Sequence, residues 1–276
     1  MQLASKLLQM KSGEPGNCSL AIDGEWWTPS PKVLALYKTY CEHEMSPPAE
    51  AIHGLLADGL VSRRNRAGTR PGVADLPHGR RGMRVRYFPS KKNNAAIPCE
   101  GQPQSDFALL AEGDTEVERL HGHPIKCGGI GWTYQPDFVA RMRDGQLIVI
   151  DVVPAGKDAS QRRLARALAC SQLLRSARIE MRVLSARAIQ AAGHIDSLRA
   201  LYHRASFTSI DELAERLRGF IDNYNAKATL AAVREFVRSE GWPPTSAEAL
   251  LWAGHLHCDS AKKITPSTML TGGRHG

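Results

Sequence analysis

An apolar run from Ile148 to Val153, carrying the single aspartate Asp151, constrains the fold of this 276-residue chain more than any other feature. A short apolar run bounded by polar residues is typical of a buried β-strand. Alternate strand residues share a face, so Asp151 and Val153 are expected on one face, while Ile150 and Val152 pack on the other. The sequence therefore predicts a carboxylate inside a packed sheet.

A second aspartate, Asp137, begins a neighbouring segment with strand character, Tyr134–Met142. The turn sequence Arg143-Asp144-Gly145 indicates a hairpin between the two strands, which would place Asp137 beside Asp151. Two carboxylates on adjacent strand ends suit Mg²⁺ or Mn²⁺, which could polarise a phosphodiester and lower the pKa of an attacking water. We predict both aspartates as metal ligands and catalytic residues. The simpler alternative is that both only make hairpin hydrogen bonds, but burying a carboxylate without a partner is unfavourable.

Composition divides the rest of the chain into regions and predicts an α/β protein. Residues 1–62 contain two helical stretches, Pro31–Glu44 and Pro47–Leu60, and form a small helical N-terminal region. Residues 63–82 are rich in Arg, Gly and Pro and are expected to form a flexible basic linker. Residues 83–194 form the core, and residues 195–276 a C-terminal, mostly helical domain.

Within the core we expect a helix over Ser105–Leu120 with Ser105 as its N-cap, then the hairpin strands. A helix follows over residues 158–175 with Asp158 or Ser160 as cap, and then a strand over Ile179–Leu184. In the C-terminal domain, Ser209 with Glu212 and Thr245 with Glu248 fit capping boxes. A set of small helices followed by a hairpin between Leu256 and Leu270 is a winged-helix layout.

Positive charge favours a polyanionic partner. The chain has 36 Lys and Arg against 28 Asp and Glu, a formal net charge of +8. Guanidinium groups suit phosphates, although a merely basic protein remains the simpler alternative. The arginines predicted to contact double-stranded DNA form local clusters: Arg63, Arg64 and Arg66; Arg80, Arg81, Arg84 and Arg86; and Arg162 and Arg163, with Arg166 close by.

Other classes are not indicated. The six cysteines contain no C-x-x-C pair, which argues against a zinc ribbon or a secreted disulfide scaffold. The chain has no run of about 18 apolar residues and no signal-peptide core, so we expect a cytoplasmic, nucleoid-associated protein without a membrane partner. The glycines of Cys127–Gly131 lack the lysine and helix of a nucleotide-binding loop.

The order helix, strand with Pro136-Asp137, strand with Asp151-x-Val153, helix and strand resembles the restriction-endonuclease-like core of the PD-(D/E)XK nucleases. The longer run from Ile97 to Asp151 resembles TnsA, the endonuclease subunit of heteromeric transposases. The likeness is carried by Ile97–Gly101, Asp106–Leu110, Val117–Pro124 and Tyr134–Phe138, and by Ala249–Leu256 with Ile264-Thr265, which is similar to the winged-helix end of TnsA. It implies DNA cleavage with Mg²⁺ or Mn²⁺, and partners that include a transposase and an AAA+ ATPase.

Two departures from that pattern affect activity. The family's glutamate falls on Gln104, and its lysine falls on Val153. An apolar side chain cannot activate water or offset phosphate charge, and losing such a group costs about 10² to 10⁴-fold in rate. We therefore expect a catalytically impaired or inactive subunit that acts in transposon-end binding and assembly and needs no metal.

Two alternatives stay open. The first is an active nuclease in which Lys157 or Lys126 replaces the lysine and Glu100 or Asp106 replaces the acid. The second is a stand-alone DNA-binding regulatory or accessory protein, which would differ from the TnsA-like transposition subunit in its partners.

Overall fold

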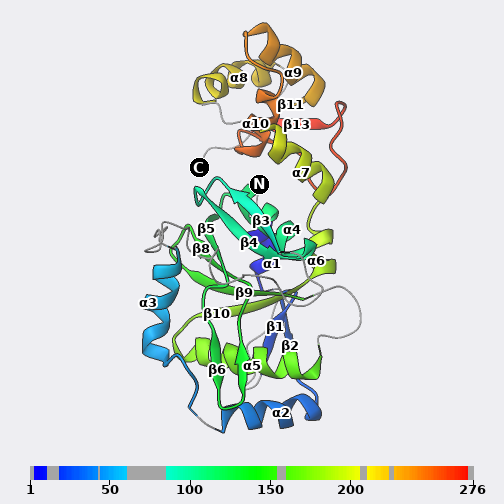
Figure 1. The fold of residues 1–276 in the computed structure, drawn as a ribbon. Coiled ribbons are helices and arrows are strands. Elements are labelled where there is room, and N and C mark those ends of the chain that lie inside the picture. Colours follow the sequence, from blue (N-terminus) through cyan, green and yellow to red (C-terminus); the bar gives the residue numbers. More distant parts are fainter. Residues whose placement is uncertain are drawn as a thin grey trace. The chain divides into compact units, whose positions relative to one another are not determined.

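The computed structural model describes residues 3–10, 19–42, 44–60, 85–153, 160–205, 210–223 and 227–272. They separate into two compact units (Figure 1). The larger holds Ala4–Glu112 and Glu116–Ile189, and the smaller is mainly the chain from Gln190 onwards, close to the expected boundary at residue 195. The predicted linker, with Arg63, Arg64, Arg66, Arg80 and Arg81, lies outside the described residues, as do Arg84 and Lys157.

The larger unit is built on a mixed sheet, so the α/β class is confirmed. Its strand order is β2-β1-β10-β9-β8-β5. The central pair β9–β10 is parallel, whereas β8 runs antiparallel to β9 as the predicted hairpin requires. The bounds are β1 Leu20–Ile22, β2 Glu25–Trp27, β5 Val117–Gly122, β8 Phe138–Met142, β9 Leu147–Val153 and β10 Glu180–Ser185.

Helix α5 (Gln161–Ser176) connects β9 to β10 and covers one face of the sheet, and α2 (Pro31–Cys41) packs against α5 (Figure 1). The core on this face contains Val149 and Val153 of β9 and Leu168 of α5. Because strand residues alternate, Asp151 lies on this same face, as the sequence predicts. Helix α4 (Gln102–Gly113) covers the opposite face, with the rings of Phe107 and Phe138 5.5 Å apart.

Smaller elements complete this unit. Helix α3 (Ala49–Leu60) adds Ile52 and Leu56 to the core. Two hairpins flank the sheet, β3 (Val85–Ser90) with β4 (Ala95–Glu100), and β6 (Cys127–Gly129) with β7 (Trp132–Tyr134). Short helices α1 (Ala4–Leu8) and α6 (Ala186–Ala191) lie near its chain ends.

Several sequence expectations are corrected here. The helix expected over Ser105–Leu120 ends at Gly113, and Val117–Gly122 is instead strand β5, because its buried residues pair with β8. Ser105 lies inside α4 and does not cap it. The N-terminal region is not separate and helical, because β1 pairs in parallel with β10 and extends the main sheet.

The second unit combines helices with a small sheet of order β11-β13-β12. The capping box expected at Thr245 is absent, since the Thr245 side chain makes no cap hydrogen bond. Glu248 instead pairs with Arg234 at 2.6 Å and Arg204 at 3.6 Å. No helix among the described residues is long and apolar enough to cross a membrane. The elements are α7 Ile195–Arg204, α8 Asp211–Asn223, β11 Lys227–Thr229, α9 Leu230–Ser239, α10 Ser246–Trp252, β12 Leu256–His257 and β13 Met269–Gly272.

Candidate functional site

The structure brings Asp137 and Asp151 together at one end of the β8–β9 pair. Phe138 pairs with Ile150 across the two strands, so the residues that adjoin this pair, Asp137 and Asp151, lie side by side. The Asp137 side chain is held by the backbone N–H of Val152, which donates to Oδ2 at 2.7 Å. Both carboxylates are buried, with 0% of Asp137 and 1% of Asp151 exposed.

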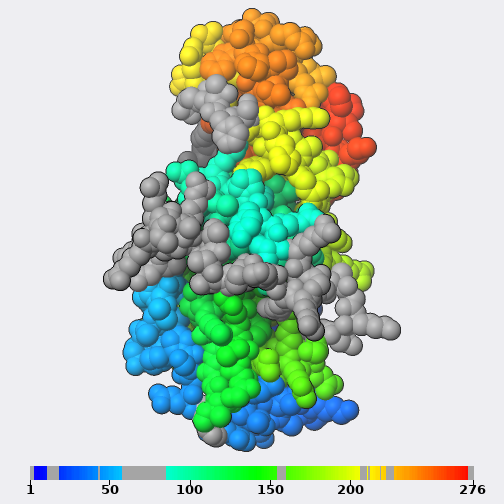
Figure 2. Space-filling view, viewed as in Figure 1, coloured from blue at the N-terminus to red at the C-terminus, as the bar shows by residue number. Residues whose placement is uncertain are grey.

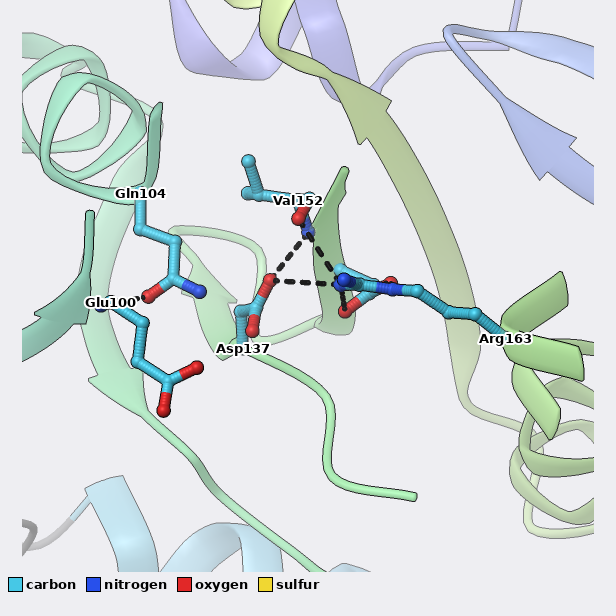
Figure 3. A network of polar contacts seen from close by, with 6 residues as sticks. Glu100, Gln104, Asp137, Val152 and Arg163 are labelled. Carbon is cyan, nitrogen blue, oxygen red and sulfur yellow. Dashed lines mark hydrogen bonds and ion pairs between the residues drawn. The ribbon is translucent and has the colours of Figure 1, made fainter. Parts of the chain in front are cut away.

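A third side chain, Arg163 in the first turn of α5, approaches both carboxylates, and Figure 3 shows it reaching towards Asp137 and Val152. Its Nη2 donates to both carboxylate oxygens of Asp151, at 3.0 and 3.1 Å, and to the Val152 carbonyl oxygen at 3.2 Å. The same nitrogen is 3.9 Å from Asp137 Oδ2. Arg163 was predicted to contact DNA, and the structure places it inside the site as the partner of the acidic pair.

Local sequence explains how Arg163 reaches this position. Ser160 is the N-cap of α5, and its Oγ accepts a hydrogen bond from the Arg163 backbone N–H at 3.3 Å, so the expected cap at Ser160 is confirmed. Capping fixes where the helix begins, and the start of the helix sets which residue faces β9. Arg163 is 24% exposed at its side chain, so the ion pair with Asp151 is only partly screened by water.

Burial and neighbouring charges shift the pKa values of Asp137 and Arg163. Burial, and then the charge of Asp151, raise the pKa of Asp137 well above its ordinary value, while Arg163 and the Val152 N–H act in the opposite sense. Burial lowers the pKa of Arg163, but the charges of Asp151 and then Asp137 outweigh it, so the pKa is raised overall. Arg163 therefore stays charged, and Asp137 keeps its proton to a higher pH than an exposed aspartate.

This arrangement does not fit a divalent metal ion. Both oxygens of Asp151 accept hydrogen bonds from Arg163, and Oδ2 of Asp137 accepts one from Val152. Among the described residues, only Oδ1 of Asp137 in this pair has no hydrogen-bond partner. The same residues contain no cluster of three or more His, Cys, Asp or Glu side chains that could hold a metal. A guanidinium also carries its charge where a metal would carry its own, and like charges repel.

The other predicted catalytic residues have structural roles. Gln104 Oε1 accepts a hydrogen bond from the Glu100 backbone N–H at 2.6 Å, which ties β4 to α4. In the view of Figure 3, Glu100 and Gln104 lie on the far side of Asp137 from Arg163. Val153 is a buried apolar side chain of the core beneath the sheet. Asp106 accepts from Gln102 within α4.

The remaining cations that the sequence singled out lie in different places. Arg86 on β3 donates to Gln102 at 2.5 Å and does not reach the acidic pair. Lys126 and Arg162 are exposed, and both line a cavity beside Arg163. No local pattern indicates that Arg163, rather than a lysine, contacts the aspartates.

The sequence matched no protein-family model, and a search of curated proteins found no match. The resemblance to TnsA therefore stays an expectation from the residues described above.

Proposed function

We propose that this chain is a DNA-binding subunit, resembling TnsA, whose nuclease-like centre does not cleave DNA. The observation that carries the proposal is the position of the Arg163 guanidinium. It donates hydrogen bonds to both carboxylate oxygens of Asp151 and lies 3.9 Å from Oδ2 of Asp137. Along the chain, α4 is followed by strands β5 to β9, then by α5 and β10. This order of helix, antiparallel strands, helix and parallel strand supports the comparison with a restriction-endonuclease-like core.

Loss of cutting follows from the chemistry at this position. Metal-assisted hydrolysis needs an open coordination position and a group that activates water. Arg163 supplies positive charge but cannot coordinate water, and Val153 supplies no amine. Each of these losses costs about 10² to 10⁴-fold in rate, so a fold retained without cutting would act by binding.

Binding to DNA is supported by the net charge of +8. In this proposal the larger unit binds transposon ends, and the smaller unit contacts a transposase or an AAA+ ATPase. Assembly at DNA would then place the protein at the nucleoid. A stand-alone regulator would bind DNA equally well but would form no complex with such partners.

Incubation of the purified full chain with supercoiled plasmid and Mn²⁺ or Mg²⁺ tests the proposal. We expect the plasmid to be retarded in a gel but never nicked, at any protein concentration. Nicking by the natural protein that Asp137→Ala abolishes would overturn it and favour the active alternative, with Glu100 and either Lys126 or Lys157 as catalytic groups. Arg187→Ala, an exposed arginine on α6, is the matched control.

A further inference from the structure

A basic cavity of about 670 Å³ lies between the β6–β7 hairpin and the first turns of α5. Lys126 and Tyr134 line it from the hairpin side, and Ser160, Arg162 and Arg166 line it from α5. The hairpin, green in Figure 2, is on the surface of the larger unit beside α3. The volume falls within the range of about 300 to 1,000 Å³ that is typical of small-ligand sites.

The charge in this cavity is positive. Lys126, Arg162, Arg163 and Arg166 line it, and none of its lining residues in the described part of the chain is acidic. Asp151 offsets the charge of Arg163, but the exposed Lys126 and Arg162 face solvent. The cavity also adjoins the N-terminus of α5, a 16-residue helix whose dipole favours an anion there.

A buried donor in the wall lacks an acceptor. Nε of Arg166 is buried and has no partner among the described residues. A buried donor without an acceptor costs about 1 to 3 kcal/mol, so this group points to an acceptor that a ligand supplies. The Tyr134 side chain, only 8% exposed, lies beside it in the wall, and its hydroxyl faces the Asp151 carboxylate.

Arg166 and Tyr134 are also held in place. The guanidinium carbon of Arg166 lies 5.6 Å from the centre of the Tyr40 ring, a cation–π contact that orients the side chain. Burial, and then Asp151, raise the pKa of Tyr134 well above its ordinary value, so its hydroxyl remains a donor at neutral pH. A ligand rich in acceptor oxygens and negative charge matches these groups.

We propose that this cavity binds a phosphate group of the nucleic-acid backbone, with charge from Lys126, Arg162 and Arg166 and a hydrogen bond from the Tyr134 hydroxyl. The proposal rests on the proposed function insofar as DNA is the source of the phosphate. A free nucleotide carries the same group, and separate measurements distinguish the two.

The test compares full-length variants in two binding assays. Lys126→Ala, Arg162→Ala, Arg166→Ala and Tyr134→Phe are each titrated against a fluorescein-labelled DNA duplex by anisotropy, and against thymidine 5′-monophosphate by calorimetry. The duplex titrations run from about 50 to 200 mM salt, because each lost phosphate contact reduces the salt dependence of log affinity by about one. Arg187→Ala removes an exposed charge elsewhere and is the control.

For a phosphate in this cavity, we expect each of the charge variants to weaken duplex binding by about tenfold and to reduce the salt dependence. Tyr134→Phe should weaken binding without changing the salt dependence, and Arg187→Ala should change neither. Equal duplex binding by all variants would overturn the cavity proposal and leave the proposed function intact.

The nucleotide titration tests the phosphate site independently of DNA binding. Nucleotide binding that the cavity variants lose, in a protein that binds no duplex, would support the phosphate site and contradict the DNA-binding function. Absence of both kinds of binding would overturn both. Thermal melting of each variant distinguishes lost binding from lost folding, and Tyr134→Phe keeps the test valid if a charge variant fails to fold.

Discussion

At the scale of single residues, Arg163 neutralises the buried negative charge of Asp151. Asp151 is 1% exposed, and Arg163 contacts both of its oxygens. Replacing Arg163 by alanine leaves Asp151 without its ion-pair partner, and breaking a buried pair in this way costs about 3 to 5 kcal/mol of the free energy of unfolding. Urea denaturation at neutral pH measures this loss.

The neighbouring Arg162 provides the control for that experiment. It is exposed and lies on the same turn of α5, so Arg162→Ala is expected to change stability by less than about 0.5 kcal/mol. Equal stability of the Arg163→Ala and Arg162→Ala proteins would contradict the compensating role of Arg163.

Removing Arg163 is also expected to create affinity for a divalent ion. In Arg163→Ala the oxygens of Asp151 are released beside Asp137, and two carboxylates form a hard oxygen site. Millimolar Mn²⁺ should therefore raise the melting temperature of this variant, with no effect on the natural protein. Adding Asp151→Ala should remove the metal effect, and a Mn²⁺ effect in the natural protein would show that Arg163 does not block the site.

Asp137 predicts a pH dependence of stability. Its pKa is raised in the folded protein, whereas in the unfolded chain it titrates at about 4. The unfolded state therefore loses its proton first as the pH rises, and stability falls from about pH 4 up to the folded pKa. Asp137→Asn removes this titration and can still accept from Val152, so it should melt higher at neutral pH and lose less stability between pH 4 and 8.

The two aspartates were predictable from sequence, but Arg163 was not. Strand alternation and the turn at Arg143-Asp144-Gly145 suffice to place Asp137 beside Asp151. Contact with Arg163 depends on how α5 crosses the sheet and where its first turn begins. The local hydrophobic periodicity predicts neither. Arg163 was therefore grouped with Arg162 as a surface charge.

At the scale of elements, α5 and the β6–β7 hairpin enclose thiols. Cys127 of β6 and Cys170 of α5 are buried with their sulfur atoms 3.2 Å apart. Burial raises the pKa of Cys170 well above its ordinary value, and burial followed by Asp137 raises the pKa of Cys99 to about 12. Cys170 and Cys99 therefore stay protonated, and all three cysteines are shielded from solvent.

This burial predicts a protection pattern. In the folded, reduced protein at pH 8, iodoacetamide should leave Cys99, Cys127 and Cys170 unmodified, because the reagent cannot reach these buried sulfur atoms. The half-buried Cys41 is the internal comparison, and all should react in urea. Peptide mass spectrometry reads the pattern, and alkylation of Cys170 as fast as Cys41 would contradict the packing of α5 against the hairpin.

Helices with a strong cap or apolar stripe were predicted closely, whereas short strands were not. Ser160 before α5 gave a clear start, and α5 was expected within a few residues of its bounds. Local sequence predicts helix as far as Leu120, because the six residues of Val117–Gly122 contain too few alternations to indicate a strand. Its pairing with β8, rather than local preference, makes it a strand.

At the scale of the whole molecule, the sheet joins segments that are distant in sequence. Strand β1 pairs in parallel with β10, Ala21 opposite Arg182, and so brings the N-terminal region into the larger unit. A three-residue strand has almost no periodic signal, and its partner lies far along the chain. The domain boundary at residue 62 was misplaced for this reason, although the α/β class was evident from local patterns.

The position of the positive charge along the chain determines which arginines are available to bind DNA. Arg63, Arg64 and Arg66, in the predicted basic linker, are expected to neutralise phosphates. Replacing all three by glutamine should reduce the salt dependence of log affinity for a duplex by about 2.7, at about 0.9 for each contact.

Removing three positive charges from the smaller unit should leave the salt dependence of duplex binding unchanged. Arg199, Arg216 and Arg238 are each paired with a carboxylate, at 2.8, 2.8 and 2.6 Å respectively. Replacing these three by glutamine removes equal charge, but their partners already hold them, so the salt dependence should stay as in the natural protein. If both triple variants reduce it equally, binding follows total charge alone and no arginine cluster is a specific contact surface.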